Sequence, residues 1–249
     1  MLIADASLWF LGLMLITSLG SGATATVVGF GIGSLLTPVI AARFGTDVAI
    51  SAVALPHLAG SLLRGWRLRG SIDWSVLVRF GILSAVGGLV GALFFARLTL
   101  VVLTRTLGAL LVLTAITGLT GWTEQWKPRG ALVWIFSALS GFFGGVVGNQ
   151  GGLRAAALST FGLAPTAFVA TSTVIGVLVD LARTPVYLYG AGQRLTGLWG
   201  LVTLTTAGVL AGTLGGERLL FGLSPSRFRV AVSIAIGLLG LWFLLGPAK

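Results

Sequence analysis

The sequence predicts an all-α polytopic membrane protein made of two inverted-topology repeats, each with a short broken or re-entrant helix after a glycine-rich run. Of the 249 residues, 56% are hydrophobic and 9% are charged, whereas a soluble domain has roughly 25% charged residues. Long apolar runs alternate with short polar stretches, and one glycine pattern occurs twice. These observations exclude a soluble domain and leave no room for an extramembrane catalytic domain.

Ten apolar segments follow one another along the chain, each bounded by glycine, proline or charged residues. Two of them, 33–43 and 153–161, are too short to cross a bilayer. Each of these two follows a glycine cluster, which is typical of a broken or re-entrant helix. The expected segments are 7–30, 33–43, 47–64, 74–96, 99–121, 130–147, 153–161, 165–190, 195–221 and 226–246.

The surroundings of the two short segments match each other. Gly33–Ala54 reads GSLLTPVIAARFGTDVAISAVA, and Gly152–Ser172 reads GLRAAALSTFGLAPTAFVATS. Both contain a glycine, a short apolar helix, Phe-Gly, a polar turn and a helix of small residues. Each half then orders its segments long, short, long, long, long. We therefore expect a first transmembrane repeat at 1–122, a cytoplasmic linker at 123–129 and a second repeat at 130–249.

The basic loops indicate that the two halves are inverted. The strongly basic loop follows the third segment in the first half and the fourth segment in the second half. Because Lys and Arg mark cytoplasmic loops, this shift places the halves upside down relative to each other, with both termini outside. The net charge of +10 then reflects topology, and we expect no nucleic-acid partner. The residues that mark these loops are Arg64, Arg67, Arg69, Arg218, Arg227 and Arg229.

The two glycine clusters form the candidate substrate site. A broken helix leaves backbone N–H groups unpaired, and these groups together with the helix dipole favour an anion. Glycine lets the backbone approach a ligand closely, although close packing of membrane helices is the alternative for any single glycine. Hydroxyl groups near the second cluster offer weak polar ligands. The expected substrate-binding residues are Gly29, Gly31, Gly33, Gly148, Asn149, Gln150, Gly151, Gly152, Arg154, Thr171 and Ser172.

Arg154 is the cation of this site. It stands at the start of a short helix, where a positive charge opposes the helix dipole. A charge near the bilayer centre costs at least about 2.5–3.5 kcal/mol, so an anionic substrate or a buried partner is expected to compensate it. The alternative is a shallow position from which Arg154 reaches the headgroups. Arg79 and Arg105 also lie inside apolar segments, where they either reach the headgroups or line an anion pathway.

Three further ionisable residues are candidates for coupling or gating. Asp180 and Arg183 lie three residues apart on one helix face, as a structural ion pair or as a gate. His57 is the only histidine, and histidine is the side chain whose unperturbed pKa lies near neutrality. It is the first candidate for proton coupling, and packing between helices is the alternative.

No cofactor or metal is expected. The chain has no Cys and one His, which excludes Cys-based zinc sites, iron–sulfur clusters and poly-His metal sites. No G-x-x-x-x-G-K-[ST] motif is present, so the driving force would come from the substrate gradient, a proton gradient or the membrane potential. An intramembrane enzyme is disfavoured, because few acid–base or nucleophilic groups are available.

The paired stretches GFGIGSLLTPVIAARFGTDVAISAVA and GNQGGLRAAALSTFGLAPTAFVATS resemble the sulfite exporter TauE/SafE family, and the resemblance covers essentially the whole chain. Members usually have a proline in both short helices, whereas here Pro38 has Ala156 or Ala157 opposite. The resemblance implies transport of sulfur-containing anions such as sulfite or organosulfonates.

The sequence as a whole is interpreted as a secondary transporter, in the export direction, of the cell (inner) membrane. Its site lies between the two repeats, and access to that site alternates. A passive anion channel and a carrier of a non-sulfur organic anion are the alternatives. The expected partners are the small anion and the lipid bilayer, and proton coupling and a homodimer are left open.

Overall fold

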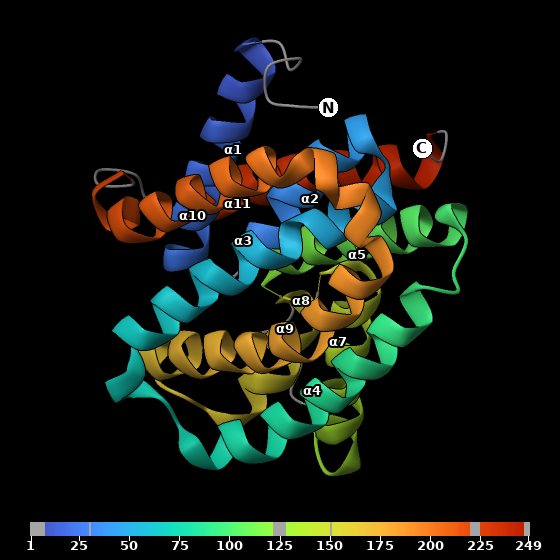
Figure 1. The fold of residues 1–249 in the computed structure, drawn as a ribbon. Helices are drawn as coiled ribbons and strands as arrows, with labels where there is room; N and C mark the ends of the chain where they lie inside the picture. The colour runs from blue at the N-terminus through green and yellow to red at the C-terminus, as the bar shows by residue number, and fades with distance from the viewer. Residues whose placement is uncertain (1–7, 30, 122–127, 150, 220–224, 247–249) are drawn as a thin grey trace.

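The computed structural model describes residues 8–29, 31–121, 128–149, 151–219 and 225–246, and these residues form ten α-helices (Figure 1). Gln150 and positions 123–127 of the expected linker lie outside the described residues. The helices are α1 (Leu8–Val28), α2 (Ile32–Phe44), α3 (Thr46–Arg67), α4 (Trp74–Phe95), α5 (Leu100–Thr120), α7 (Ala131–Val147), α8 (Gly151–Leu158), α9 (Pro165–Leu195), α10 (Trp199–Leu219) and α11 (Pro225–Leu245).

Each expected segment corresponds to one of these helices, and the differences lie at their ends. α3 continues three residues beyond the expected end at 64, and α9 continues five residues beyond 190. α8 stops at Leu158, and the rest of the expected segment is the 3₁₀ turn Ser159–Phe161. A local signal explains the start of α4, where the side chain of Asp73 accepts a hydrogen bond from Val76 N (2.9 Å).

Six helices among the described residues are long and apolar enough to cross a membrane, and three shorter apolar helices accompany them. Large hydrophobic side chains are also exposed on the outer faces of the bundle, for example Ile82, Val86 and Leu93 on α4. A protein in water would not expose so many apolar side chains in continuous faces. The surface therefore suits a lipid environment.

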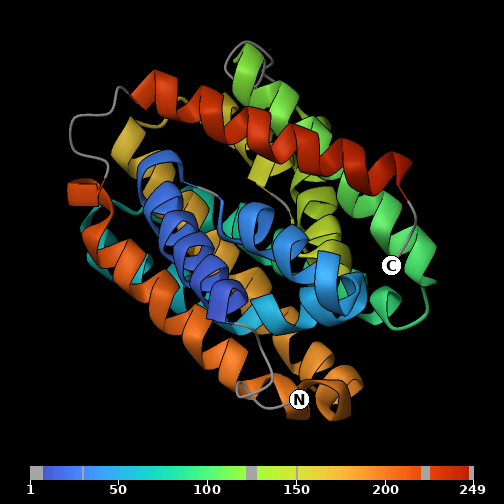
Figure 2. The same ribbon diagram turned by 90° about the horizontal axis from the view of Figure 1, so that it is seen from above.

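Helices of one half pack against helices of the other half in matching pairs. α1 lies along α10, and α7 lies along α4, so the first helix of each half packs on the fourth helix of the other. α5 lies along α11 (Figure 2), and α3 lies along α9 (Figure 1). The short helices differ, because α2 packs on α1 and α3, whereas α8 packs mainly on α7 and α5. Exchanging the two halves thus preserves the main helix pairs.

Glycines allow these helix pairs to approach closely. A Cβ atom on Gly22 of α1 would collide with the Val209 carbonyl oxygen of α10. On α4, Cβ atoms on Gly87 and Gly91 would collide with the backbone carbonyls of Ala138 and Phe142 of α7. Membrane helices use small residues in this way because close backbone contact replaces the hydrophobic driving force. These glycines are explained by packing.

Replacing Gly22 with Ala is expected to lower thermal stability, whereas the same change at Gly20, two residues away on α1, is expected to be neutral or slightly stabilising. Gly20 has no atom within 4 Å of an added Cβ, whereas an added Cβ at Gly22 would lie 2.9 Å from Thr213 N as well as against Val209 O. Overpacking of this kind costs about 1–3 kcal/mol. Melting temperatures of the two variants in the same detergent test this, and equal values would contradict it.

Candidate functional site

The breaks after α1 and after α7 lie against each other at the centre of the bundle. Gly29 and Gly31 in the first break have φ values of 86° and 135°, and Gly148 in the second has 73°. Glycine adopts these angles at little cost, so one helix can end and the next can begin within a few residues at each break. A Cβ atom on Gly33 would lie 2.6 Å from the Gly148 carbonyl oxygen, so the two breaks are in backbone contact.

A hydrogen bond also joins the two breaks. Ser34 Oγ, in the first turn of α2, donates to Asn149 Oδ1, just before α8, over 3.4 Å. The cap residue of α2, Gly31, has no side chain to satisfy the first N–H groups of the helix. The starts of both short helices therefore face one small region with backbone donors that favour an anion.

A cavity of about 20 Å³ occupies this region, which is room for roughly one water molecule. The two helix breaks line it together with the second half of α3 and the first half of α9. In this conformation it is too small for a sulfur oxyanion, so the surrounding helices must separate before such an ion enters. Its lining residues are Ala25, Gly29, Gly31, Ile32, Gly33, Ser34, His57, Ser61, Arg64, Gly148, Asn149, Gly151, Arg154, Thr173 and Gly176.

Three buried side chains present unpaired donors at this cavity. Arg154 is 4% exposed, and its Nε and Nη1 atoms have no hydrogen-bond partner. Arg64 is 5% exposed with Nη1 unpaired, and Asn149 is 4% exposed with Nδ2 unpaired. An unsatisfied buried polar group costs about 1–3 kcal/mol, and a charged one costs more. Such a cluster of unpaired donors fits a ligand that accepts hydrogen bonds and has negative charge.

Gly176 provides the space for Arg154. A Cβ atom on Gly176 of α9 would lie 3.0 Å from Arg154 Nη1. The guanidinium of α8 thus rests against the backbone of α9, where a larger side chain would displace it. The expected site residue Arg154 therefore lies in the cavity, with its charge buried.

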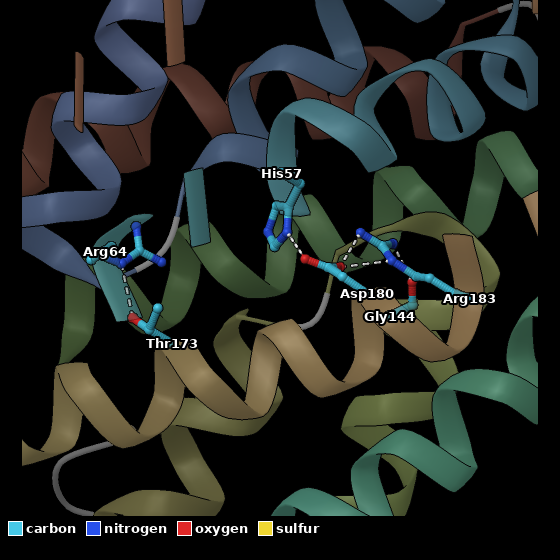
Figure 3. Close-up of polar contacts among 6 residues, drawn as sticks. All are labelled: His57, Arg64, Gly144, Thr173, Asp180 and Arg183. Carbon is cyan, nitrogen blue, oxygen red and sulfur yellow. Dashed lines mark hydrogen bonds and ion pairs between the residues drawn. The ribbon is translucent and has the colours of Figure 1, made fainter. Parts of the chain in front are cut away.

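Arg64 also belongs to this cavity, although its position near the end of a segment indicated a cytoplasmic loop. α3 continues past it to Arg67, so Arg64 lies within the helix. Its Nε donates to Thr173 Oγ1 of α9 over 2.8 Å (Figure 3). The sequence feature that could have predicted this position is the spacing of His57, Ser61 and Arg64, which places all three on one helical face. Of the predicted loop residues, Arg67 and Arg69 are exposed.

A buried charge network borders the cavity. Asp180 is fully buried and Arg183 is 1% exposed. Arg183 Nε donates to Asp180 Oδ1 over 2.9 Å, and His57 Nδ1 lies 2.6 Å from Asp180 Oδ2 (Figure 3). Arg183 Nη1 donates to the Gly144 carbonyl over 2.6 Å. The network therefore joins α3, α7 and α9, and it includes the expected ion pair of Asp180 and Arg183.

The charges around the cavity do not balance. The guanidinium groups of Arg64, Arg154 and Arg183 have three positive charges, and Asp180 has the single carboxylate of the described residues that pairs with any of them. Three minus one leaves two positive charges uncompensated with His57 neutral. No group of three or more His, Cys, Asp or Glu side chains that could hold a metal occurs among the described residues.

The remaining expected site residues lie around this cavity in different ways. Thr171 does not line it, because its Oγ1 accepts a hydrogen bond from Asp73 N (2.9 Å) at the start of α4. Ser172 is buried without lining the cavity, and its neighbour Thr173 lines it instead. A Cβ on Gly152 would face Thr114 Oγ1 of α5 at 3.4 Å. Gln150 lies outside the described residues.

Two arginines on other helices are also outside the cavity. Arg79 is exposed on α4. Arg105 of α5 donates to the Phe243 carbonyl of α11 over 3.2 Å. Neither residue lines the cavity, so the expected anion pathway through this pair is not found in this conformation.

Among known proteins, the chain matches one family model. The family model described as "Sulfite exporter TauE/SafE" matches residues 14–243. Searches of curated proteins and of solved structures found no match. Since the family match covers nearly the whole chain and the described helices include six that are able to cross a membrane, the chain belongs to the sulfite exporter TauE/SafE family of membrane transporters.

Proposed function

We propose that this protein is a secondary transporter that exports small sulfur-containing anions, such as sulfite or organosulfonates, through the cavity between the two helix breaks. The observation that carries the proposal is the set of unpaired donors of Arg64, Arg154 and Asn149, all buried and all at one cavity. Hydrogen bonds from charged donors to an oxyanion are roughly twice as strong as neutral ones. An oxyanion would satisfy these donors and compensate the buried charge.

The position of the cavity supports alternating access. It is lined by α2 and α3 of the first half and by α8 and α9 of the second, so movement of one half against the other would open it. The pairing of like helices across the halves, α1 with α10 and α4 with α7, supports a pseudo-two-fold relation. With the basic loops of the sequence, it supports an inverted repeat whose termini lie outside.

Export of an anion needs no nucleotide. The cell interior is negative, so each negative charge that leaves gains about 2.3 kcal/mol per 100 mV. The membrane potential therefore drives an anion outward through a carrier of this kind. A proton gradient would add to this driving force, but export of the anion does not require it.

Counterflow in proteoliposomes tests the proposal. Liposomes that contain the native protein and unlabelled sulfite are placed in labelled sulfite, and the same experiment is done with a small sulfonate. A carrier gives saturable uptake of label through exchange. Flux that does not saturate would show a passive anion channel instead, and no flux with either anion would place the substrate outside the sulfur oxyanions.

Replacing His57 with Gln is expected to leave potential-driven export within a few-fold of the native rate and to remove any acceleration by a pH gradient. His57 lines the cavity and contacts Asp180, and histidine is the side chain whose unperturbed pKa lies near neutrality. Export of a sulfonate, which binds no proton in this range, is measured under an imposed potassium potential and then under an imposed pH gradient. A pH response that survives in the variant would assign proton coupling to another group.

A further inference from the structure

We propose that the cavity selects doubly charged anions over singly charged ones, and that Arg64 sets this preference. The inference rests on the proposed anion transport and concerns the charge of the ion that the same cavity accepts. Its basis is the number of buried guanidinium groups that lack a negative partner.

Arg183 does not contribute to this selection. Its Nε and Nη2 atoms contact Asp180 Oδ1 at 2.9 and 2.8 Å, and its Nη1 donates to the Gly144 carbonyl. Its charge is therefore neutralised by Asp180. His57 faces the same carboxylate through Nδ1, and a neutral imidazole leaves the charge balance of the cavity unchanged.

Arg64 and Arg154 remain as two uncompensated cations. Both are at least nine-tenths buried, both have an unpaired nitrogen, and both line the one cavity. Arg64 belongs to α3 in the first half and Arg154 to α8 in the second. Two like charges held in a medium of low dielectric repel each other. An ion with two negative charges would compensate both of them, whereas an ion with one charge would leave one cation unpaired.

The position of Arg64 is fixed by its neighbour. Its Nε donates to Thr173 Oγ1 over 2.8 Å, so this side of the guanidinium is occupied and Nη1 is left for the cavity. Arg67, three residues further on α3, is exposed and donates to the Thr213 carbonyl over 3.4 Å. It has the same charge on the same helix but lies outside the cavity, and it is therefore the matched control.

The test compares two anions of the same shape and different charge. Sulfate and methanesulfonate are both tetrahedral, and methanesulfonate has a methyl group and one charge fewer. Each is used to compete with labelled sulfite for the purified full-length chain in detergent, in mildly alkaline buffer where sulfite is doubly charged. We expect sulfate to compete more strongly than methanesulfonate by roughly thirty-fold, the usual order for one unpaired buried charge.

Substitutions then assign the preference to Arg64. Arg64→Gln is expected to weaken sulfate competition by roughly thirty-fold and methanesulfonate competition only a few-fold, which abolishes the preference. Arg64→Lys keeps the charge and is expected to keep the preference, and Arg67→Gln is expected to behave like the native protein.

Several results would overturn the inference. Equal competition by sulfate and methanesulfonate in the native protein would leave anion transport standing but remove charge selection, and this comparison requires no variant. If neither ion competed while sulfite still bound, the selectivity would depend on the shape of the anion and not on its charge. Equal loss of both ions in Arg64→Gln would make Arg64 a general binding or structural residue. Absence of sulfite binding itself would instead be a failure of the proposed function.

Discussion

Arg154→Gln is expected to reduce saturable sulfite exchange by about a hundredfold or more while leaving the protein at least as stable as the native chain. Arg154 is buried at the cavity with two unpaired nitrogens, so an anion there would lose its charged donor. Losing one partner of a buried charged contact costs about 2–5 kcal/mol of binding. The change also removes an uncompensated buried cation, and this removal by itself stabilises the fold.

The measurement combines counterflow with thermal unfolding in detergent. Arg105→Gln is the control, because Arg105 is a partly buried arginine that contacts the Phe243 carbonyl and lies outside the cavity. It is expected to exchange sulfite at a rate near that of the native protein. An Arg154→Gln variant that loses exchange because it melts at a much lower temperature would show a structural role and contradict the prediction.

Asp180→Asn is expected to have the opposite effect on stability, with a loss of about 3–5 kcal/mol. Asp180 is the carboxylate between Arg183 and His57. Without its charge, the guanidinium of Arg183, which is 1% exposed, has no carboxylate partner among the residues that the structure describes. The contacts that join α3, α7 and α9 at this point would then weaken together.

A double-mutant cycle measures this effect. Asp180→Asn, Arg183→Gln and the double variant are compared by melting temperature and by the yield of monodisperse protein. The double variant is expected to be more stable than Asp180→Asn alone, because it no longer contains an unpaired buried cation. If Asp180→Asn were as stable as the native protein, the ion pair of Asp180 and Arg183 would not stabilise the helix bundle, and the structural role proposed for it would be wrong.

The two predictions distinguish two uses of buried arginine in one molecule. Arg183 has a carboxylate partner and a backbone acceptor, and its removal from that pairing is expected to destabilise the fold. Arg154 has free donors at a cavity, and its removal is expected to affect transport instead. The sign of the stability change therefore separates a structural charge from a substrate-binding charge.

Much of the fold could be predicted from local features of the sequence. The apolar segments correspond to the ten helices, because the length of an apolar run and the glycines and prolines at its ends are local properties. At the helix breaks, Gly29, Gly31 and Gly148 have the positive φ values that glycine permits. The pair of Asp180 and Arg183 also follows from local spacing, since residues three apart on a helix face each other.

The tertiary structure alone decided which of these local features meet. Arg64 binds Thr173, which is 109 positions away, and His57 binds Asp180, which is 123 positions away. Hydrophobic periodicity in an all-apolar helix does not show which face packs on a particular neighbour. For the same reason, the sequence pointed to Thr171 and Ser172, whereas the rotation of α9 places their neighbour Thr173 at the cavity. By itself, the sequence determined that helices break at two glycine clusters, whereas the packing of α3 against α9 decided which charges those breaks enclose.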